Sequence, residues 1–207
     1  METRVKLLEG ALEVLRTRGI AGASARVIAA AAGVNQALVF YHFGTVDDLL
    51  VAALGHGAES RVARYRERFA GIDSIGGLVE LGRAVREEEQ AAGNFTVLAQ
   101  LLAGGQANPK LAEATAAGLA LWTREVEAVL ARVLAGTPLA EFVHVGGLAR
   151  ALASSFIGLE LYAGVDADAA RQATGALDEL AMLMSVLDDL GPVVRRAVRA
   201  RLRRTAR

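Results

Sequence analysis

The sequence contains no cysteine, and this absence excludes several kinds of chemistry. Without cysteine the chain forms no disulfide, has no thiolate nucleophile and binds no metal through a cysteine thiolate. Proline is also scarce, with three residues in 207. Because β-branched clusters are few as well, the composition favours an all-helical chain.

Long apolar runs are missing too. Residues 27–46 and 90–109 carry no charge, but both contain Asn, Gln and Gly, so neither resembles a membrane span. The N-terminal segment has Glu2, Glu9 and Glu13 inside its apolar pattern, which is not the pattern of a signal peptide. We therefore expect a cytoplasmic protein with no membrane partner.

Neither sign of charge is in excess over the whole chain, because 23 basic residues balance 23 acidic ones. The charges are nevertheless segregated: residues 1–70 sum to +2, residues 71–190 to −9 and residues 191–207 to +7. Such asymmetry suggests different surfaces for different partners. The seven arginines of the last segment indicate either a solvated terminus that rests on the acidic part or an element that binds DNA, membrane or an acidic surface.

Apolar residues recur at helical spacing along the whole chain, which predicts an all-α fold. Three short helices are expected within the first 45 residues. A fourth begins at the capping-box-like Thr45-Val-Asp-Asp48 and ends near Phe69. Further helices are predicted at about 74–92, 95–106, 110–135, 140–164 and 167–189, followed by a basic helical tail from Pro192.

The segment from Ser24 to Phe43 reads SARVIAAAAGVNQALVFYHF and has the spacing of a helix-turn-helix. This motif requires a small residue where two helices touch and a glycine where the backbone turns, and Ala29 and Gly33 meet these needs. An ordinary helical hairpin has the same spacing, so the spacing alone leaves both interpretations open. Four apolar residues are available to hold the second helix in place: Ile28, Val34, Val39 and Phe43.

The flanking residues extend this pattern. ALEVLRTRG precedes the motif, and the fourth helix follows it with TVDDLL. Over about residues 5–52 the chain strongly resembles the N-terminal domain of TetR-family transcriptional regulators. The resemblance implies a homodimeric DNA-binding regulator, which we expect to be a repressor released from a palindromic operator by a small-molecule effector. It implies no cofactor and no metal.

The resemblance also implies a division into domains. Residues 1–46 would form the helix-turn-helix DNA-binding domain, and residues 47–190 a larger helical domain for effector binding and dimerisation. The helix at 46–70 would link the two, and residues 191–207 would remain as the basic tail.

Several DNA contacts follow from the resemblance, residue by residue. Gln36 is the expected base reader, because a carboxamide pairs with the N6 and N7 atoms of adenine. Ser24 would cap the second helix and present its hydroxyl to a phosphate. Arg26, in the first turn of that helix, would reach a phosphate or a base edge. Asn35 would either cap the third helix or read a base, with capping the favoured role, and Ala37 shares the same turn.

The far end of the third helix supplies the remaining candidates. Tyr41 would contact a phosphate or a thymine methyl group, and His42 is expected to be partly structural. Thr45, with the first amides of the fourth helix, would hold another phosphate. Phe40 stands where the family often has a tyrosine, and Val46 where it often has a lysine. These departures lower the expected affinity for DNA.

Two apolar stripes near the C-terminus match the helices that pair in family dimers. Packing against the chain's own core is the alternative for both stripes. The candidate dimer residues are Val145, Ala149, Leu152, Phe156 and Leu159 on the first helix and Leu180, Leu183, Met184 and Leu187 on the second.

An effector pocket is expected among the helices between residues 74 and 135, closed in part by the helix at 140–164. A buried aromatic side chain needs no ligand, so core packing is the alternative for each liner. The candidates are Asn94, Phe95, Leu98, Gln100, Leu102, Trp122, Val126 and His144. Glu141 and His144 have the Glu-x-x-His spacing of a metal ligand pair, but the sequence has no second such pair, so no metal site is expected.

Two other classes of protein compete with the regulator. One is an all-helical enzyme or carrier without DNA binding, and the other is an activator that needs no effector. The sequence has no phosphate-binding Walker loop, no Gly-x-Ser-x-Gly and no His-Glu-x-x-His, which weighs against an enzyme.

Overall fold

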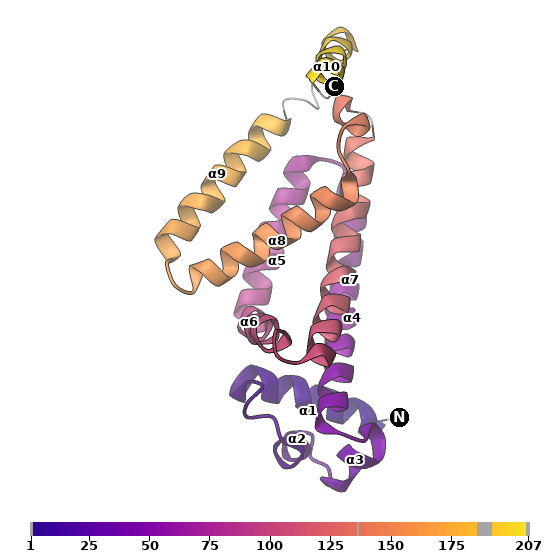
Figure 1. The fold of residues 1–207 in the computed structure, drawn as a ribbon, viewed down its shortest axis with the longest axis vertical. Helices are drawn as coiled ribbons and strands as arrows, with labels where there is room; N and C mark the ends of the chain where they lie inside the picture. The colour runs from indigo at the N-terminus through magenta and orange to yellow at the C-terminus, as the bar shows by residue number, and fades with distance from the viewer. Residues whose placement is uncertain (1, 136, 186–191, 206–207) are drawn as a thin grey trace. The chain divides into compact units, whose positions relative to one another are not determined.

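The computed structural model describes residues 2–135, 137–185 and 192–205. Within these ranges the chain forms α-helices and one short 3-10 helix, η1, and no β-strand (Figure 1). The expected all-α fold is therefore confirmed. The bounds are α1 Glu2–Arg18, α2 Ala25–Ala31, α3 Ala37–Phe43, α4 Val46–Ala70, α5 Ile75–Ala91, α6 Asn94–Gly105, α7 Pro109–Leu134, η1 Pro138–Glu141, α8 Val145–Ala163, α9 Ala167–Ser185 and α10 Pro192–Thr205.

The chain divides into two compact units. Unit 1 comprises residues 1–64 and 87–121, and unit 2 comprises residues 65–86 and 122–207. The helices α4, α5 and α7 each contribute residues to both units. The N-terminal helices share unit 1 with α6 and with the first half of α7, and the domain boundary expected at residue 46 stays a prediction.

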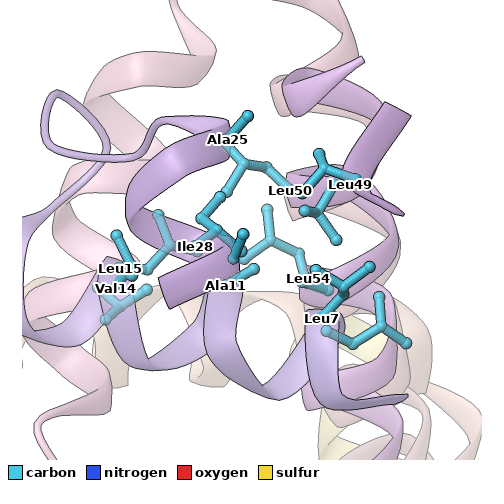
Figure 2. Close-up of a cluster of buried hydrophobic side chains, with 14 of the residues drawn as sticks. Leu7, Ala11, Val14, Leu15, Ala25, Ile28, Leu49, Leu50 and Leu54 are labelled. Carbon is cyan, nitrogen blue, oxygen red and sulfur yellow. The ribbon is translucent and has the colours of Figure 1, made fainter. Parts of the chain in front are cut away.

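We call residues 2–53 the head; they comprise α1, α2, α3 and the start of α4. Apolar side chains at helical spacing along α1 and α4 meet those of α2 in one cluster (Figure 2). Leu7, Leu15, Ile28, Val39 and Leu49 are the largest of its members that are almost completely buried. Burying a leucine or an isoleucine stabilises a fold by about 1.5–3 kcal/mol, so this cluster fixes the arrangement of the head's helices.

The core of the head extends beyond the head itself. Val97 and Leu101 of α6 and Leu111 of α7 are buried in the same cluster. Gln100 of α6 adds a polar contact, since its Oε1 accepts a hydrogen bond of 3.1 Å from the backbone N–H of Ile20, which follows α1. Residues more than forty positions after the head therefore complete its interior.

Unit 2 has two further apolar clusters. In one, Tyr65 and Phe69 of α4 pack against Val129 and Val133 of α7. In the other, Leu130 and Leu134 of α7 pack against Ala149 of α8. Two ion pairs also connect helices of this unit: Arg86 with the buried Glu160, and Arg83 with Asp178 at 2.6 Å.

The helix predicted at 140–164 is wrong at its beginning. Residues 138–141 form η1 instead. Thr137 caps η1, because its hydroxyl oxygen accepts a hydrogen bond of 3.2 Å from the backbone N–H of Leu139. The helix α8 begins only at Val145, because Nδ1 of His144 accepts a hydrogen bond of 2.9 Å from the N–H of Gly147 and caps it. Leu187 and the end of the helix predicted at 167–189 lie outside the described residues.

No single helix of the described ranges is long and apolar enough to cross a membrane. The pair α3 and α4 passes a test of length and composition together, but the two helices are bent by 69° at their junction.

Candidate nucleic-acid interface

The turn between α2 and α3 has the geometry that a helix-turn-helix needs. The N–H of Gly33 donates to the carbonyl of Ala30, and the N–H of Val34 donates to the carbonyl of Ala29, which together close α2. Gly33 has a φ of +64°, a conformation that glycine adopts at little cost. The chain therefore reverses within a few residues and starts α3 across the end of α2.

Close packing of α1 against α2 requires a second glycine, Gly10, which sequence reasoning missed. A Cβ atom at Gly10 would lie 2.9 Å from the Cβ of Ala32 and 3.1 Å from the carbonyl oxygen of Ile28. Its signal in the sequence was a glycine on the buried face of a helix, a position that usually favours alanine or a larger residue.

The helix α3 is anchored on one face and open on the other. Val39 is completely buried in the core of the head, whereas Phe40 is about half exposed and Tyr41 is 81 % exposed. Gln36 and Ala37 at its beginning are exposed as well. The ring of His42 lies between those of Tyr41 and Phe43, with centroid distances of 5.0 and 6.3 Å. This arrangement leaves a polar and aromatic surface on a firmly positioned helix.

Asn35 caps α3. Its Oδ1 accepts a hydrogen bond of 2.8 Å from the backbone N–H of Ala37, which otherwise has no partner within the helix. Gln36 is the residue before the first helical position and makes no capping hydrogen bond with its side chain. Of these two neighbouring amides, Gln36 is therefore the one whose side chain has no capping role in α3.

At the start of α2, Ser24 and Arg26 are both exposed. The Oγ of Ser24 accepts a long hydrogen bond of 3.4 Å from the N–H of Val27, as an N-cap residue does. Arg26 lines an open groove of about 600 Å³ between α1 and α2, together with Arg18 and Glu13. The N–H groups of this first turn give the region a positive potential.

The start of α4 is less suited to an anion. The hydroxyl of Thr45 accepts a hydrogen bond of 3.0 Å from the N–H of Asp48 and donates one of 2.6 Å to the carboxylate of Asp48. The Nζ of Lys110 on α7 donates to the same carboxylate at 2.9 Å. The hydrogen bond from Thr45, followed by that from Lys110, lowers the pKa of Asp48 below its ordinary value, so this negative charge persists. A phosphate held by Thr45 would have to overcome the repulsion of Asp48.

The eight candidates for the effector pocket fall in both units, five in unit 1 and three in unit 2. Several have clear structural contacts. Asn94 donates to the buried Glu89 at 2.8 Å, and Trp122 packs against the ring of Tyr65 at a centroid distance of 5.4 Å. Because His144 caps α8 and Gln100 contacts Ile20, both are already explained without a ligand.

The candidate dimer residues separate into two groups. Ala149 is a correction: it is completely buried in the chain's own core and has no surface for a partner, and Val145 packs beside it. Phe156 and Leu159 are partly buried, whereas Leu152, Leu180 and Leu183 are exposed large apolar side chains. Leu187 and the side chain of Met184 lie outside what the structure describes.

The turn, the anchored α3 and its exposed polar face define a helix-turn-helix protein. Residues 7–53 match the family model of bacterial regulatory proteins of the tetR family. Together with the relatives that follow, this match assigns residues 7–53 to the N-terminal DNA-binding domain of TetR-family transcriptional regulators.

Three relatives illustrate the similarity. The HTH-type transcriptional regulator UidR of Escherichia coli (strain K12) is 27 % identical over 110 residues, which are 53 % of this chain and 55 % of that protein. The matched region thus spans about half the length of this curated relative.

The two others are solved structures. A transcriptional regulator from Rhodococcus sp. Rha1 is 26 % identical with a TM-score of 0.69, over 91 % of this chain and 99 % of the other. The multidrug binding protein EbrR, solved with proflavin, is 27 % identical with a TM-score of 0.57, over 84 % and 99 % of the two chains. The family consists of regulators and not enzymes, in agreement with the expectation from the sequence.

Proposed function

We propose that the protein is a homodimeric repressor that binds a palindromic operator through the head and is released by a small-molecule effector. The observation that carries this proposal is the anchored helix α3, whose Val39 is buried while Gln36 and Tyr41 are exposed. A helix held in this way presents the same side chains to the major groove each time it binds.

Within this proposal the exposed residues of the head have different roles. Gln36 reads a base, because its carboxamide donates to and accepts from an adenine edge. Ser24 and Arg26 contact phosphates and fix the register on the duplex. Tyr41 contacts a phosphate or a thymine methyl group. The remaining candidates are Asn35, Ala37, Phe40, His42 and Thr45, of which Thr45 has the weakest support because Asp48 occupies its hydroxyl.

A dimer is supported by the exposed leucines of α8 and α9. Leu152, Leu180 and Leu183 are between 39 % and 61 % exposed in the single chain. Exposed apolar side chains of this kind are typical of a protein interface. A twofold dimer would place two heads on half-sites about one helical turn, ~34–36 Å, apart.

Release by an effector is supported by the family and by the naming of EbrR as a multidrug binding protein solved with proflavin. An effector lowers operator affinity only by its differential affinity for the two conformations of the dimer. We propose that it binds in the helical part of the chain that follows the head.

The test is a selection of bound duplexes from a random pool, with the purified full chain. We expect enrichment of a palindrome with two similar half-sites. A matched selection with the variant Gln36→Ala should give a palindrome that is degenerate at one position in each half-site. If the full chain enriches no sequence, the proposal fails and a carrier without DNA binding becomes the better description.

A further inference from the structure

Arg4 and Phe43 form a contact that the roles assigned above do not explain. The guanidinium carbon of Arg4, in the first turn of α1, lies 5.1 Å from the centre of the Phe43 ring. This is the distance of a cation–π interaction, which stabilises by about 0.5–1 kcal/mol at exposed sites. Arg4 itself is exposed to solvent.

Phe43 has a defined position, and it therefore defines that of Arg4. It is the last residue of α3 and packs, partly buried, against the core of the head. Gly44, with a φ of +78°, and Thr45 follow it directly. The guanidinium group of Arg4 thus lies beside Phe43 at the end of α3, and the exposed Tyr41 precedes Phe43 by two residues.

Of the five cations of the head, two have ion pairs with carboxylates, and Arg4 is not one of them. Lys6 pairs with Glu2 at 2.5 Å, and Arg16 pairs with Glu13 at 2.7 Å, so each of these two cations is partly neutralised. At the start of α4, Asp47 and Asp48 add two negative charges. Within the described part of the chain, no carboxylate forms an ion pair with Arg4. The positive charge of Arg4 is therefore not neutralised by an ion pair.

We propose that Arg4 is a DNA-backbone contact, positioned by stacking on Phe43. Stacking uses the flat face of the guanidinium and leaves the N–H groups in its plane free to donate to phosphate oxygens. Such a contact fixes the register of α3 in the groove but does not read the sequence. It compensates for the acidic start of α4. This inference rests on the proposed DNA binding of the head.

The experiment measures the salt dependence of binding to the selected palindrome for the wild type, Arg4→Ala and Arg4→Lys. Loss of one phosphate contact lowers the slope of log K against log salt by about 0.9 for each head. We expect this decrease for Arg4→Ala, and equal weakening on the palindrome and on unrelated duplexes. Arg4→Lys should retain most of the slope and still bind more weakly, since an ammonium group does not stack as a guanidinium does.

Arg16→Ala is the matched control. It removes the same charge from the same helix about 18 Å away, at 1.5 Å per residue. Its slope should equal that of the wild type. If Arg4→Ala leaves the slope unchanged, or if Arg16→Ala lowers it equally, Arg4 is not a specific contact and the proposal is overturned.

A second variant, Phe43→Leu, keeps an apolar side chain in the core and removes the ring. Its thermal melting reports whether the head still folds. We expect it to weaken binding in the wild-type background and to have little further effect in Arg4→Ala, because both changes remove one interaction. Additive effects would overturn the positioning role of Phe43. Absence of any DNA binding by the wild type would instead overturn the proposed function, and the two failures are thus distinguishable.

Discussion

Single residues with unusual backbone or side-chain environments determine how α3 is presented. Gly33 turns the chain in a left-handed conformation, Gly10 lets α2 approach α1, and Val39 fixes the inner face of α3. The outer face keeps polar and aromatic groups. Of the inner residues, Gly33 and Val39 were identified from the sequence pattern, because burial and the turn impose a spacing, whereas Gly10 was missed. An outer residue such as Gln36 is assigned only by resemblance.

Replacing Gly33 by alanine should destabilise the protein by about 1–2 kcal/mol, the cost of a left-handed conformation for an L-residue with a side chain. No atom lies within 4 Å of the added Cβ, so the cost comes from the backbone alone. Gly55→Ala in α4 is the control, since its Cβ also meets nothing within 4 Å. That change should stabilise by about 0.5–1 kcal/mol. Denaturant unfolding of both variants measures the difference, and equal effects would contradict the role of Gly33.

Gln36→Ala should change the preference for one base pair in each half-site by about 1–3 kcal/mol, because a bidentate amide–adenine pair is lost. Binding to the selected palindrome and to its single-base variants measures this. The stability of the fold should not change, since Gln36 makes no capping hydrogen bond. Weakening by the same factor on every duplex would exclude Gln36 as the base reader.

At the scale of the elements, capping residues explain where the helices begin. Asn35, Thr45 and His144 accept hydrogen bonds from the first amides of α3, α4 and α8. The sequence predicted the first two, because Asn and Thr are common caps. It did not predict the third, because His is a rare cap, and the helix was expected to begin near residue 140. The 3-10 turn before it was missed for the same reason.

The carboxylate of Asp48 stabilises the start of α4, and its effect depends on pH in a defined direction. Its pKa is lowered in the folded protein, so its contribution is present above its ordinary pKa of 3.8 and is lost as pH falls through the lower folded value. Asp48→Asn should therefore be less stable than the wild type at pH 7, and the difference should decrease below about pH 4. Urea unfolding at several pH values measures this.

Asp47→Asn is the control for this experiment. Both variants remove one negative charge from the first turn of α4, so both should bind DNA more tightly at low salt. Only Asp48 accepts hydrogen bonds from Thr45 and Lys110, so only its variant should change the pH dependence of stability. If the difference in stability between the wild type and Asp48→Asn does not change with pH, this role of Asp48 is contradicted.

At the scale of the whole molecule, the sequence predicted the all-α fold and the order of the helices, whereas the sites outside the head stay predictions. Helical order follows from local periodicity and breaks, which are visible in one sequence. Contacts between residues far apart in the sequence are not visible in this way, and the hydrogen bond between Gln100 and Ile20 is an example. One arginine of the basic tail has an ion-pair partner: Arg203 of α10 pairs with Glu141 of η1 at 2.7 Å, and both residues belong to unit 2.

The proposed dimer can be tested at two exposed leucines of α9. Leu180→Glu combined with Leu183→Glu should convert the protein to a monomer at micromolar concentration, because burying each leucine contributes about 1.5–3 kcal/mol. Light scattering measures the mass. Ala116→Glu with Ala120→Glu adds the same charge at exposed positions of α7 and should leave the dimer intact. A wild-type protein that is already a monomer, or a variant that still dimerises, would contradict this use of α9.

The shared core of the head has a consequence for evolution and for engineering. Since Val97, Leu101 and Leu111 complete the interior around Leu7 and Leu49, heads exchanged between relatives at the end of the family match would meet unsuited side chains from α6 and α7. Chimeric regulators should keep their solubility best when these three positions are transplanted with the head. Substitutions there and in α1 should then have accompanied one another among the descendants of a common ancestor.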